Sequence, residues 1–290
     1  MDLRTDLALE QREINGEKAD ENGIDCREYS NKFAKVTKIE ITNENGEKKL
    51  KRKKGRYITV ELDSMSEAAS CLNECAAIIA EELRQLLPKD GLILIAGLGN
   101  DQITPDALGP KCASYIFSTR HIGKELQKSI GLDNLRPVAR IIPGVLGQNG
   151  IETGEILAGI VKQVSPAALI TVDALASRRL SRLGCTVQLC NTGISPGSGV
   201  GNARAEISKE TVGVPVISIG VPTVVDALTL ACDLVGEEAK NKMEKSGEKM
   251  MVTPREIDLL IEHASKLIAA AINTTLQPHM QPDELMALVM

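Results

Sequence analysis

The chain has 290 residues, of which 43% are hydrophobic and only 2% aromatic, with no tryptophan, so its core must be aliphatic. The length allows one large domain or two small ones, and the net charge of −5 argues against a general nucleic-acid surface. No apolar run approaches the roughly 18 residues of a membrane span, and the N-terminus lacks a signal-peptide core. We therefore expect a cytoplasmic protein.

The seven cysteines form no CxxC pair, and the chain has only three histidines. An odd number of cysteines in a cytosolic chain favours thiols over disulfides. The pattern also lacks the clustered Cys and His ligands of a structural zinc site. We expect no metal and no cofactor.

The first 35 residues are polar and rich in Glu and Asn, and we expect most of them to be mobile. Residues 36–41 and 57–62 then alternate apolar and polar side chains, which predicts the two strands of a β-hairpin. The basic run between them, residues 48–56, is interpreted as the solvated end of this hairpin. The alternative is a nucleic-acid patch.

From residue 64 to 235 predicted helices and strands alternate, starting with a helix whose Ser64 and Glu67 have capping-box spacing. The expected strands are 92–97, 138–142, 167–172, 186–189 and 214–220, and the later helices are 111–119, 152–164, 224–235 and 253–276. This alternation predicts an α/β fold: a mainly parallel sheet sandwiched by helices, with an N-terminal β-hairpin extension. The expected domain comprises the hairpin region 36–62, the core 64–235 and the C-terminal helix 253–276.

Two carboxylates follow buried strands of this predicted sheet. Asp106 comes after the strand 92–97 and the turn Gly97-Leu-Gly-Asn100, and Asp173 directly follows the strand 167–172. Carboxyl ends of parallel strands share one edge of a sheet, where such folds place their sites. Two carboxylates facing one site cannot both ionise cheaply, so such a pair could supply a base and an acid. The alternative is that both cap the helices that follow.

The other motifs are weaker. His121 is not accompanied by the G-x-S-x-G turn of a serine hydrolase. The segment Gly193–Gly201 is rich in glycine but lacks the G-K-[ST] ending of a phosphate-binding loop. It is interpreted as a loop beside an active site, with a nucleotide-binding module as the alternative.

Several long motifs resemble one family closely. They are Arg4-Thr-Asp-Leu-Ala-Leu-Glu10, Lys54-Gly-Arg-Tyr-Ile58, Gly97-Leu-Gly-Asn100, Thr104-Pro-Asp-Ala-Leu-Gly-Pro110, Thr119-Arg-His121, Pro143-Gly-Val145, Gly150-Ile-Glu-Thr153, Val172-Asp-Ala-Leu-Ala176, Gly197-Ser-Gly-Val-Gly-Asn202, Val221-Pro-Thr-Val-Val-Asp-Ala227 and Met251-Val-Thr-Pro254. Together they resemble the spore germination protease of endospore-forming bacteria over nearly the whole chain.

This resemblance implies an atypical aspartic endopeptidase that degrades the small acid-soluble proteins coating spore DNA. It places the two essential aspartates on Asp106 and Asp173, in a fold similar to hydrogenase-maturation endopeptidases. Those enzymes bind a metal through two carboxylates and a histidine. A metal-dependent maturation-type peptidase is therefore the alternative, although no histidine counterpart is evident here. The resemblance also implies a homotetramer in the forespore and spore core, with no direct nucleic-acid or membrane binding.

The same resemblance implies a zymogen that trims its own N-terminus. Family substrates carry Thr-Glu before an apolar residue and Ala, and Thr5-Asp6-Leu7-Ala8 copies that pattern with Asp for Glu. We therefore predict a short propeptide, residues 1–6, cut between Asp6 and Leu7. A pocket for an acidic side chain suggests a nearby arginine, for which Arg178, Arg179 and Arg204 are candidates. Candidate oxyanion or substrate-binding groups are Gly99, Asn100, Gly199 and Asn202.

Overall fold

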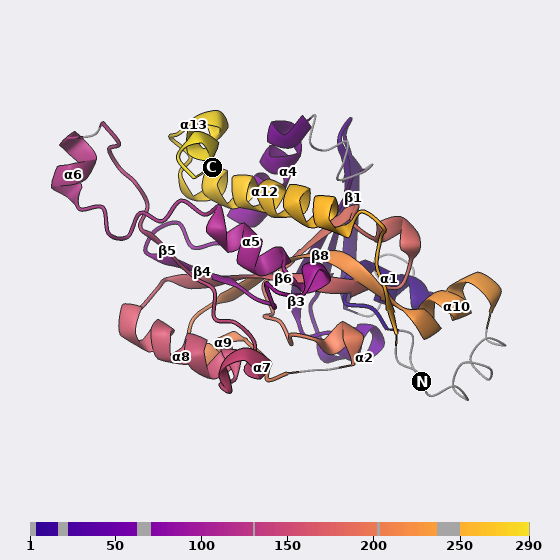
Figure 1. Cartoon of the computed structure of the whole chain (residues 1–290). Helices are drawn as coiled ribbons and strands as arrows, with labels where there is room; N and C mark the ends of the chain where they lie inside the picture. Colours follow the sequence, from indigo (N-terminus) through magenta and orange to yellow (C-terminus); the bar gives the residue numbers. More distant parts are fainter. Residues whose placement is uncertain are drawn as a thin grey trace.

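The computed structural model describes residues 4–16, 23–62, 71–129, 131–201, 204–236 and 250–289, and it is built around one large sheet (Figure 1). Along the sheet the strands follow the order β1 (Ile24–Ser30), β2 (Ala34–Ile41), β3 (Gly55–Leu62), β7 (Thr186–Cys190), β8 (Val216–Asp226), β6 (Ala168–Ser177), β4 (Ile93–Gly97) and β5 (Val138–Ile141). A ninth strand, β9 (Met251–Val252), pairs with the end of β8.

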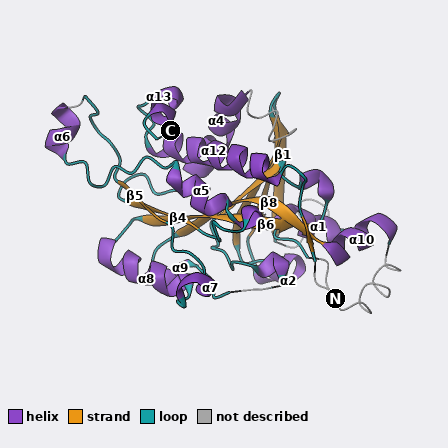
Figure 2. Ribbon diagram, in the orientation of Figure 1, coloured by secondary structure: helices purple, strands orange, loops and turns teal. Residues whose placement is uncertain are grey.

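The sheet has two parts that meet at β8. Strands β8, β6, β4 and β5 run parallel to one another, whereas β1, β2, β3 and β7 are joined by antiparallel pairing, and β7 is antiparallel to β8. Helices cover both faces (Figure 2). The predicted α/β fold, with a sheet between helices and an antiparallel N-terminal extension, is confirmed.

Each face of the parallel part has its own aliphatic core. On one face α4 (Leu72–Arg84), α5 (Leu108–Ser114) and α12 (Ile257–Leu276) cover side chains that include Ile93 and Ile95. On the other, α8 (Thr153–Val164) and α9 (Lys209–Val212) cover Leu94 and Ala96. Successive strand residues point to opposite faces, so burial of both faces explains why this stretch has no polar alternation.

The remaining helices lie at the periphery of these layers. They are α1 (Ala8–Ile14), α2 (Glu44–Leu50), α6 (Lys124–Ser129), α7 (Leu146–Asn149), α10 (Ala227–Val235) and α13 (Pro282–Ala287), with the 3₁₀ turns η2 (Thr104–Asp106), η3 (Leu180–Arg182) and η4 (Ser198–Val200). Among the described helices, none is both long and apolar enough to cross a bilayer. The expected cap at Ser64 and Glu67 lies outside the described residues.

Two expectations for the N-terminal region are wrong. Within the first 35 residues, the described parts form α1 and β1 rather than mobile chain. Leu7 and Ala8 are completely buried, which gives this polar segment an apolar anchor. Strands β2 and β3 do pair as a hairpin, in the register Ile39↔Tyr57. Their connection, however, contains α2, because the Asn43 side chain accepts a hydrogen bond from Gly46 N–H and caps a helix.

A close backbone contact brings α5 against the carboxyl ends of β4 and β6. A side-chain carbon added at Gly109 would lie 2.2 Å from the Leu98 carbonyl oxygen and 2.4 Å from the Val172 carbonyl oxygen. Neither atom belongs to a movable side chain. Only glycine therefore lets the start of α5 approach the strands this closely, which sets the position of the preceding turn η2.

This contact predicts that Gly109→Ala will lower the free energy of unfolding by about 3 kcal/mol, at the upper end for an overpacked site. Urea denaturation measures the loss. Gly159→Ala is the matched control: Gly159 lies within α8 and an added carbon meets nothing within 4 Å. That variant should be more stable by about 0.5–1 kcal/mol. Equal stability of the two variants would mean that α5 can move away from the strands freely.

Candidate active site

Asp173 lies inside β6, just beyond the end of its neighbour β4. The last pair between these strands is Gly97↔Val172, and β6 then continues to Ser177 along β8. The predicted strand ended at residue 172. The observed strand is longer because Ala174 to Ser177 pair with Val221 to Val225. Asp173 is 4% exposed, and its Oδ1 accepts a hydrogen bond of 2.9 Å from Ala174 N–H.

Asp106 reaches the same edge of the sheet from the turn η2. Its Oδ2 accepts a hydrogen bond of 2.8 Å from Asn100 N–H. The turn is held from β8, where the buried Thr223 hydroxyl donates to the Pro105 carbonyl oxygen at 2.7 Å. Gly99 has a φ of +112°, and a side-chain carbon there would lie 2.1 Å from the Asp106 carbonyl oxygen. The turn after β4 can therefore pass this close to Asp106 only with glycine at position 99.

The two carboxyl groups are electrostatically coupled. Burial is the main cause that raises the pKa of Asp173 well above its ordinary value, and the charges of Asp106 and then Asp6 raise it further. Burial also raises the pKa of Asp106, while the hydrogen bond from Asn100 opposes that shift. Both pKa values are raised, and the rise is larger for Asp173, so Asp106 ionises before Asp173 as the pH increases.

The raised pKa of Asp173 predicts how stability depends on pH. The folded state binds this proton more tightly than the unfolded state does. The resulting stabilisation is complete below the ordinary pKa of about 3.9 and is lost as pH rises through the raised value. Asp173→Asn should therefore raise Tm at pH 8 by about 2–4 °C, and the gain should shrink towards pH 4. Thermal scans at both pH values measure the change in Tm for Asp173→Asn and for the exposed-site variant Asp101→Asn. Equal changes in Tm for the two variants would contradict a raised pKa of Asp173.

Asp6 lies beside this pair, in a bend of the chain that is hydrogen-bonded to β6. Its N–H donates to the Ala176 carbonyl oxygen, and its Oδ2 accepts from Ala176 N–H, both at 2.9 Å. Its Oδ1 accepts from the Ser198 hydroxyl at 2.9 Å. The sequence predicted a cut after Asp6, and the structure brings the Asp6 side chain close enough to Asp173 for its charge to act on the pKa of Asp173.

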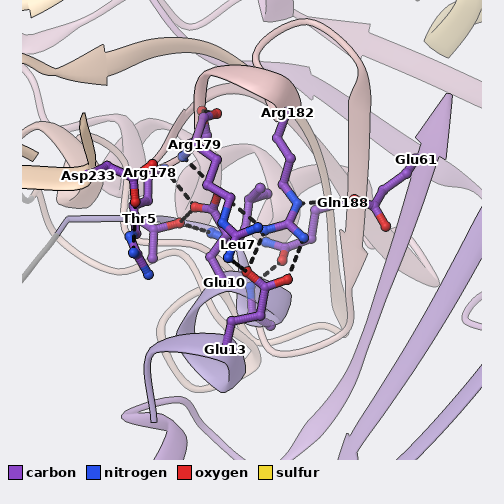
Figure 3. Close-up of polar contacts among 12 residues, drawn as sticks. Thr5, Leu7, Glu10, Glu13, Glu61, Arg178, Arg179, Arg182, Gln188 and Asp233 are labelled. Carbon is purple, nitrogen blue, oxygen red and sulfur yellow. Dashed lines mark hydrogen bonds and ion pairs between the residues drawn. The ribbon is translucent and has the colours of Figure 1, made fainter. Parts of the chain in front are cut away.

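The residues after Asp6 are anchored by a buried network around α1 (Figure 3). Glu10 is completely buried, and its carboxylate accepts hydrogen bonds from Arg178 N–H at 2.6 Å and Arg179 N–H at 3.0 Å. The Thr5 hydroxyl also donates to Glu10. The Arg182 guanidinium lies 3.4 Å from Glu10. This network keeps residues 5–10 against the loop that follows β6.

The other predicted site residues make contacts of several kinds. Arg204 is exposed, and its main-chain N–H donates to the Pro196 carbonyl oxygen at 2.9 Å. Asn100 N–H donates to Asp106 and is not directed to a substrate oxygen. The Arg178 guanidinium pairs with Asp233 at 2.7 Å, and Arg179 pairs with Glu13 at 3.4 Å, so neither provides the expected cation at Asp6. Gly199 does lie at the site, against the Asp6 carboxylate. Asn202 lies outside the described residues.

The sequence reasoning missed Gln188. Its Nε2 donates to the Asp6 carbonyl oxygen at 2.9 Å, and its Oε1 accepts from Ala8 N–H at 2.7 Å. Gln188 is 7% exposed in the middle of β7, a strand whose residues are all buried. A long amide within so short and buried a strand is itself a signal, because a buried polar group needs partners. Within the described ranges, no three His, Cys, Asp or Glu side chains are grouped so that they could hold a metal ion.

Comparisons with known proteins point to one family. A family model described as germination protease matches residues 3–241. The chain is 45% identical to a germination protease of Caldanaerobacter subterraneus subsp. tengcongensis, over 98% of this chain and 97% of that protein. It is 39% identical to a germination protease of Clostridium acetobutylicum, over 98% of each chain, and 35% identical to that of Priestia megaterium, over 94% of this chain and 93% of that protein.

Among solved structures, a [NiFe] hydrogenase maturation protease HycI from Thermococcus kodakarensis KOD1 is similar, with 18% sequence identity and a TM-score of 0.37. The match covers 66% of this chain and 98% of that chain. At this TM-score we base no argument on the similarity.

Proposed function

Because this chain belongs to the germination protease family, we propose that it cleaves small acid-soluble spore proteins after an acidic residue, through Asp106 and Asp173. The observation that carries this proposal is the pair of coupled, largely buried carboxyls at the edge where β4 ends beside β6. The proposal places the enzyme in the forespore and spore core, as a homotetramer.

The two aspartates divide the chemistry of hydrolysis. Asp106, which ionises first, accepts a proton from water as the water oxygen attacks the carbonyl carbon of the bond to be cut. Asp173 begins protonated and donates to the carbonyl oxygen as negative charge develops there. When the C–N bond breaks, the proton taken up by Asp106 passes to the leaving amine, and a hydroxyl proton of the tetrahedral intermediate returns to Asp173. The carboxylic acid formed then ionises in water. The products are a carboxylate and a free N-terminus, and both aspartates return to their starting states.

We also propose that the chain processes itself between Asp6 and Leu7. Three observations support this: Asp6 N–H donates to the Ala176 carbonyl oxygen of β6, the Asp6 carboxylate is hydrogen-bonded, and its charge acts on Asp173. Residues after the cut remain docked through Glu10, so cleavage would release only residues 1–6. Departure of Asp6 removes one negative charge from the surroundings of Asp173, which lowers the pKa of Asp173.

The testing experiment incubates the purified chain with a small acid-soluble spore protein and maps both proteins by mass spectrometry. We expect a first cut after Glu in the substrate, and a new N-terminus at Leu7 in the enzyme. A parallel sample with chelator separates the two chemistries. Unchanged turnover supports the aspartate mechanism, whereas loss of turnover that added metal restores would support the metal-dependent peptidase. No cut in the substrate under either condition would refute the proposed activity.

A further inference from the structure

The hydrogen bonds of Asp6 describe how the site binds a peptide, and they do not come from Arg178 or Arg179. We propose that Ser198, the Ala176 N–H group and the bare α-carbon of Gly199 form the pocket that selects an acidic side chain. We further propose that Gln188 clamps the main chain at the bond to be cut. This inference rests on the proposed function, since it takes Asp6 as the model of a substrate residue.

The pocket recognises a carboxylate with neutral donors. Ser198 Oγ donates to one Asp6 oxygen and Ala176 N–H to the other, each at 2.9 Å. Both carboxylate oxygens therefore have a donor. An amide could accept only the bond from Ala176 N–H and would have to donate its own N–H₂ to the Ser198 oxygen, so neither bond would be strengthened by a negative charge. Hydrogen bonds to a charged group are stronger than those between neutral groups.

Gly199 makes room for this carboxylate. A side-chain carbon at position 199 would lie 2.1 Å from Asp6 Oδ2 and 2.8 Å from the Ala176 side-chain carbon. Any other residue would therefore fill the pocket. A cavity of about 300 Å³, lined also by Lys51, Arg52 and Lys53, borders Asp6, Ser198 and Gln188, so the longer side chain of a glutamate has free volume beside the position of Asp6. The same pocket can thus accept the Asp of the N-terminal segment and the Glu of a substrate.

Gln188 contacts the main chain on both sides of the Asp6–Leu7 bond. Its Nε2 donates to the Asp6 carbonyl oxygen, which becomes the oxyanion during hydrolysis, and its Oε1 accepts from Ala8 N–H. In the sheet Gln188 pairs with Gly220, and Gly220 pairs with Asp173. Gln188 and Asp173 therefore point to the same face, two strand spacings or about 10 Å apart, with a glycine between them.

This geometry assigns Gln188 two effects on cleavage. Its donor stabilises the developing negative charge on the carbonyl oxygen, an effect that should appear mainly in kcat. Gln188 Oε1 accepts from the N–H group two residues after the acidic residue, and this bond fixes the register of the peptide in the site. The buried amide is held rigidly by β7, so little reorganisation accompanies the reaction.

The test compares two peptides that contain Thr-Glu-Leu-Ala or Thr-Gln-Leu-Ala, with kcat and KM measured for the wild-type chain and each variant. The state of each enzyme's own N-terminus is checked by mass spectrometry. Ser198→Ala should lower the preference for Glu over Gln by about 10–100-fold, the value of a hydrogen bond to a charged group. Ser195→Ala, in the same loop, should leave the preference unchanged. Gly199→Ala should raise KM for the Glu peptide and block the cut after Asp6.

Gln188→Leu should lower kcat by about 10²–10³-fold, as loss of an oxyanion donor does. If this variant does not fold, Gln188→Glu replaces it, since glutamate keeps the acceptor but loses the donor. The inference is overturned if the wild-type chain cuts the Glu peptide selectively while the Ser198 and Gly199 variants keep that selectivity and the Gln188 variant keeps its kcat. If the wild-type chain cuts neither peptide, the proposed function fails and this inference fails with it.

Discussion

Replacing Asp106 or Asp173 by Asn is expected to lower kcat for peptide-bond cleavage by about 10²–10⁴-fold, the usual contribution of a positioned acid or base. Asparagine keeps the size of the side chain but can neither accept the proton from water nor donate one to the carbonyl oxygen. Chromatography of the cleaved peptides measures the rate, and mass spectrometry of each variant should find residues 1–6 still attached.

Asp101→Asn is the matched control for these variants, because Asp101 is an exposed carboxylate in the turn that follows β4. It should retain wild-type turnover. The wild-type pH profile provides a second check: kcat/KM should fall at high pH as Asp173 loses its proton, and at low pH as Asp106 gains one. An Asn variant that retains turnover within about tenfold of wild type would remove that aspartate from the mechanism.

Replacing Arg182 by Met is expected to lower the free energy of unfolding by about 3–5 kcal/mol, the cost of leaving a buried charge without its partner. The Arg182 side chain is 9% exposed and lies between three carboxylates (Figure 3): Glu10 at 3.4 Å, Glu13 at 2.6 Å and Glu61 at 3.0 Å. Glu10 is completely buried, so its carboxylate would lose the guanidinium that lies beside it in the interior. These carboxylates in turn raise the pKa of Arg182.

Urea denaturation at pH 7 measures this loss, and Arg179→Met is its control. Arg179 is 45% exposed and makes one longer contact of 3.4 Å to Glu13, so its loss should cost less than about 1 kcal/mol. Arg182→Met should also slow the cut after Asp6, because the docking of α1 is weakened. Equal losses for the two arginine variants would show that the burial of Glu10 has no energetic consequence.

The uninterrupted apolar strands were predictable because their physical signal is local. The run Ile93–Gly97 could only be a strand covered on both faces, and the structure covers it with α5 and α12 on one side and α8 on the other. The sequence also predicted that Asp106 and Asp173 lie near each other, because the strands of a parallel sheet end at a common edge. The helices α1 and α2 were not predictable in this way. Polar residues of α1 pair with residues far along the chain, as Glu13 does with Arg182, whereas α2 begins at a local Asn43 cap that also fits a turn.

The acid-binding pocket illustrates the same limit. Because carboxylates often pair with arginine, the sequence suggested Arg178 as the partner of the acidic side chain. In the structure the Arg178 guanidinium instead forms an ion pair with Asp233 of α10. The donors that the structure places on Asp6 are a main-chain N–H group and a serine hydroxyl. Neither type is distinctive in a sequence, since every residue except proline has the former and serine is common.

The sequence by itself determined the α/β architecture, the two aspartates at one sheet edge and the acid–apolar pattern at residues 5–8, because hydrophobic periodicity and strand polarity act over a few residues. Only the tertiary structure decided what surrounds those groups. Burial and Asp106 raise the pKa of Asp173, Arg182 lies against Glu10, and Gln188 donates to Asp6. Each of these contacts joins residues that are more than 60 positions apart in the sequence. Such contacts depend on how the elements pack in three dimensions, and no local pattern encodes them.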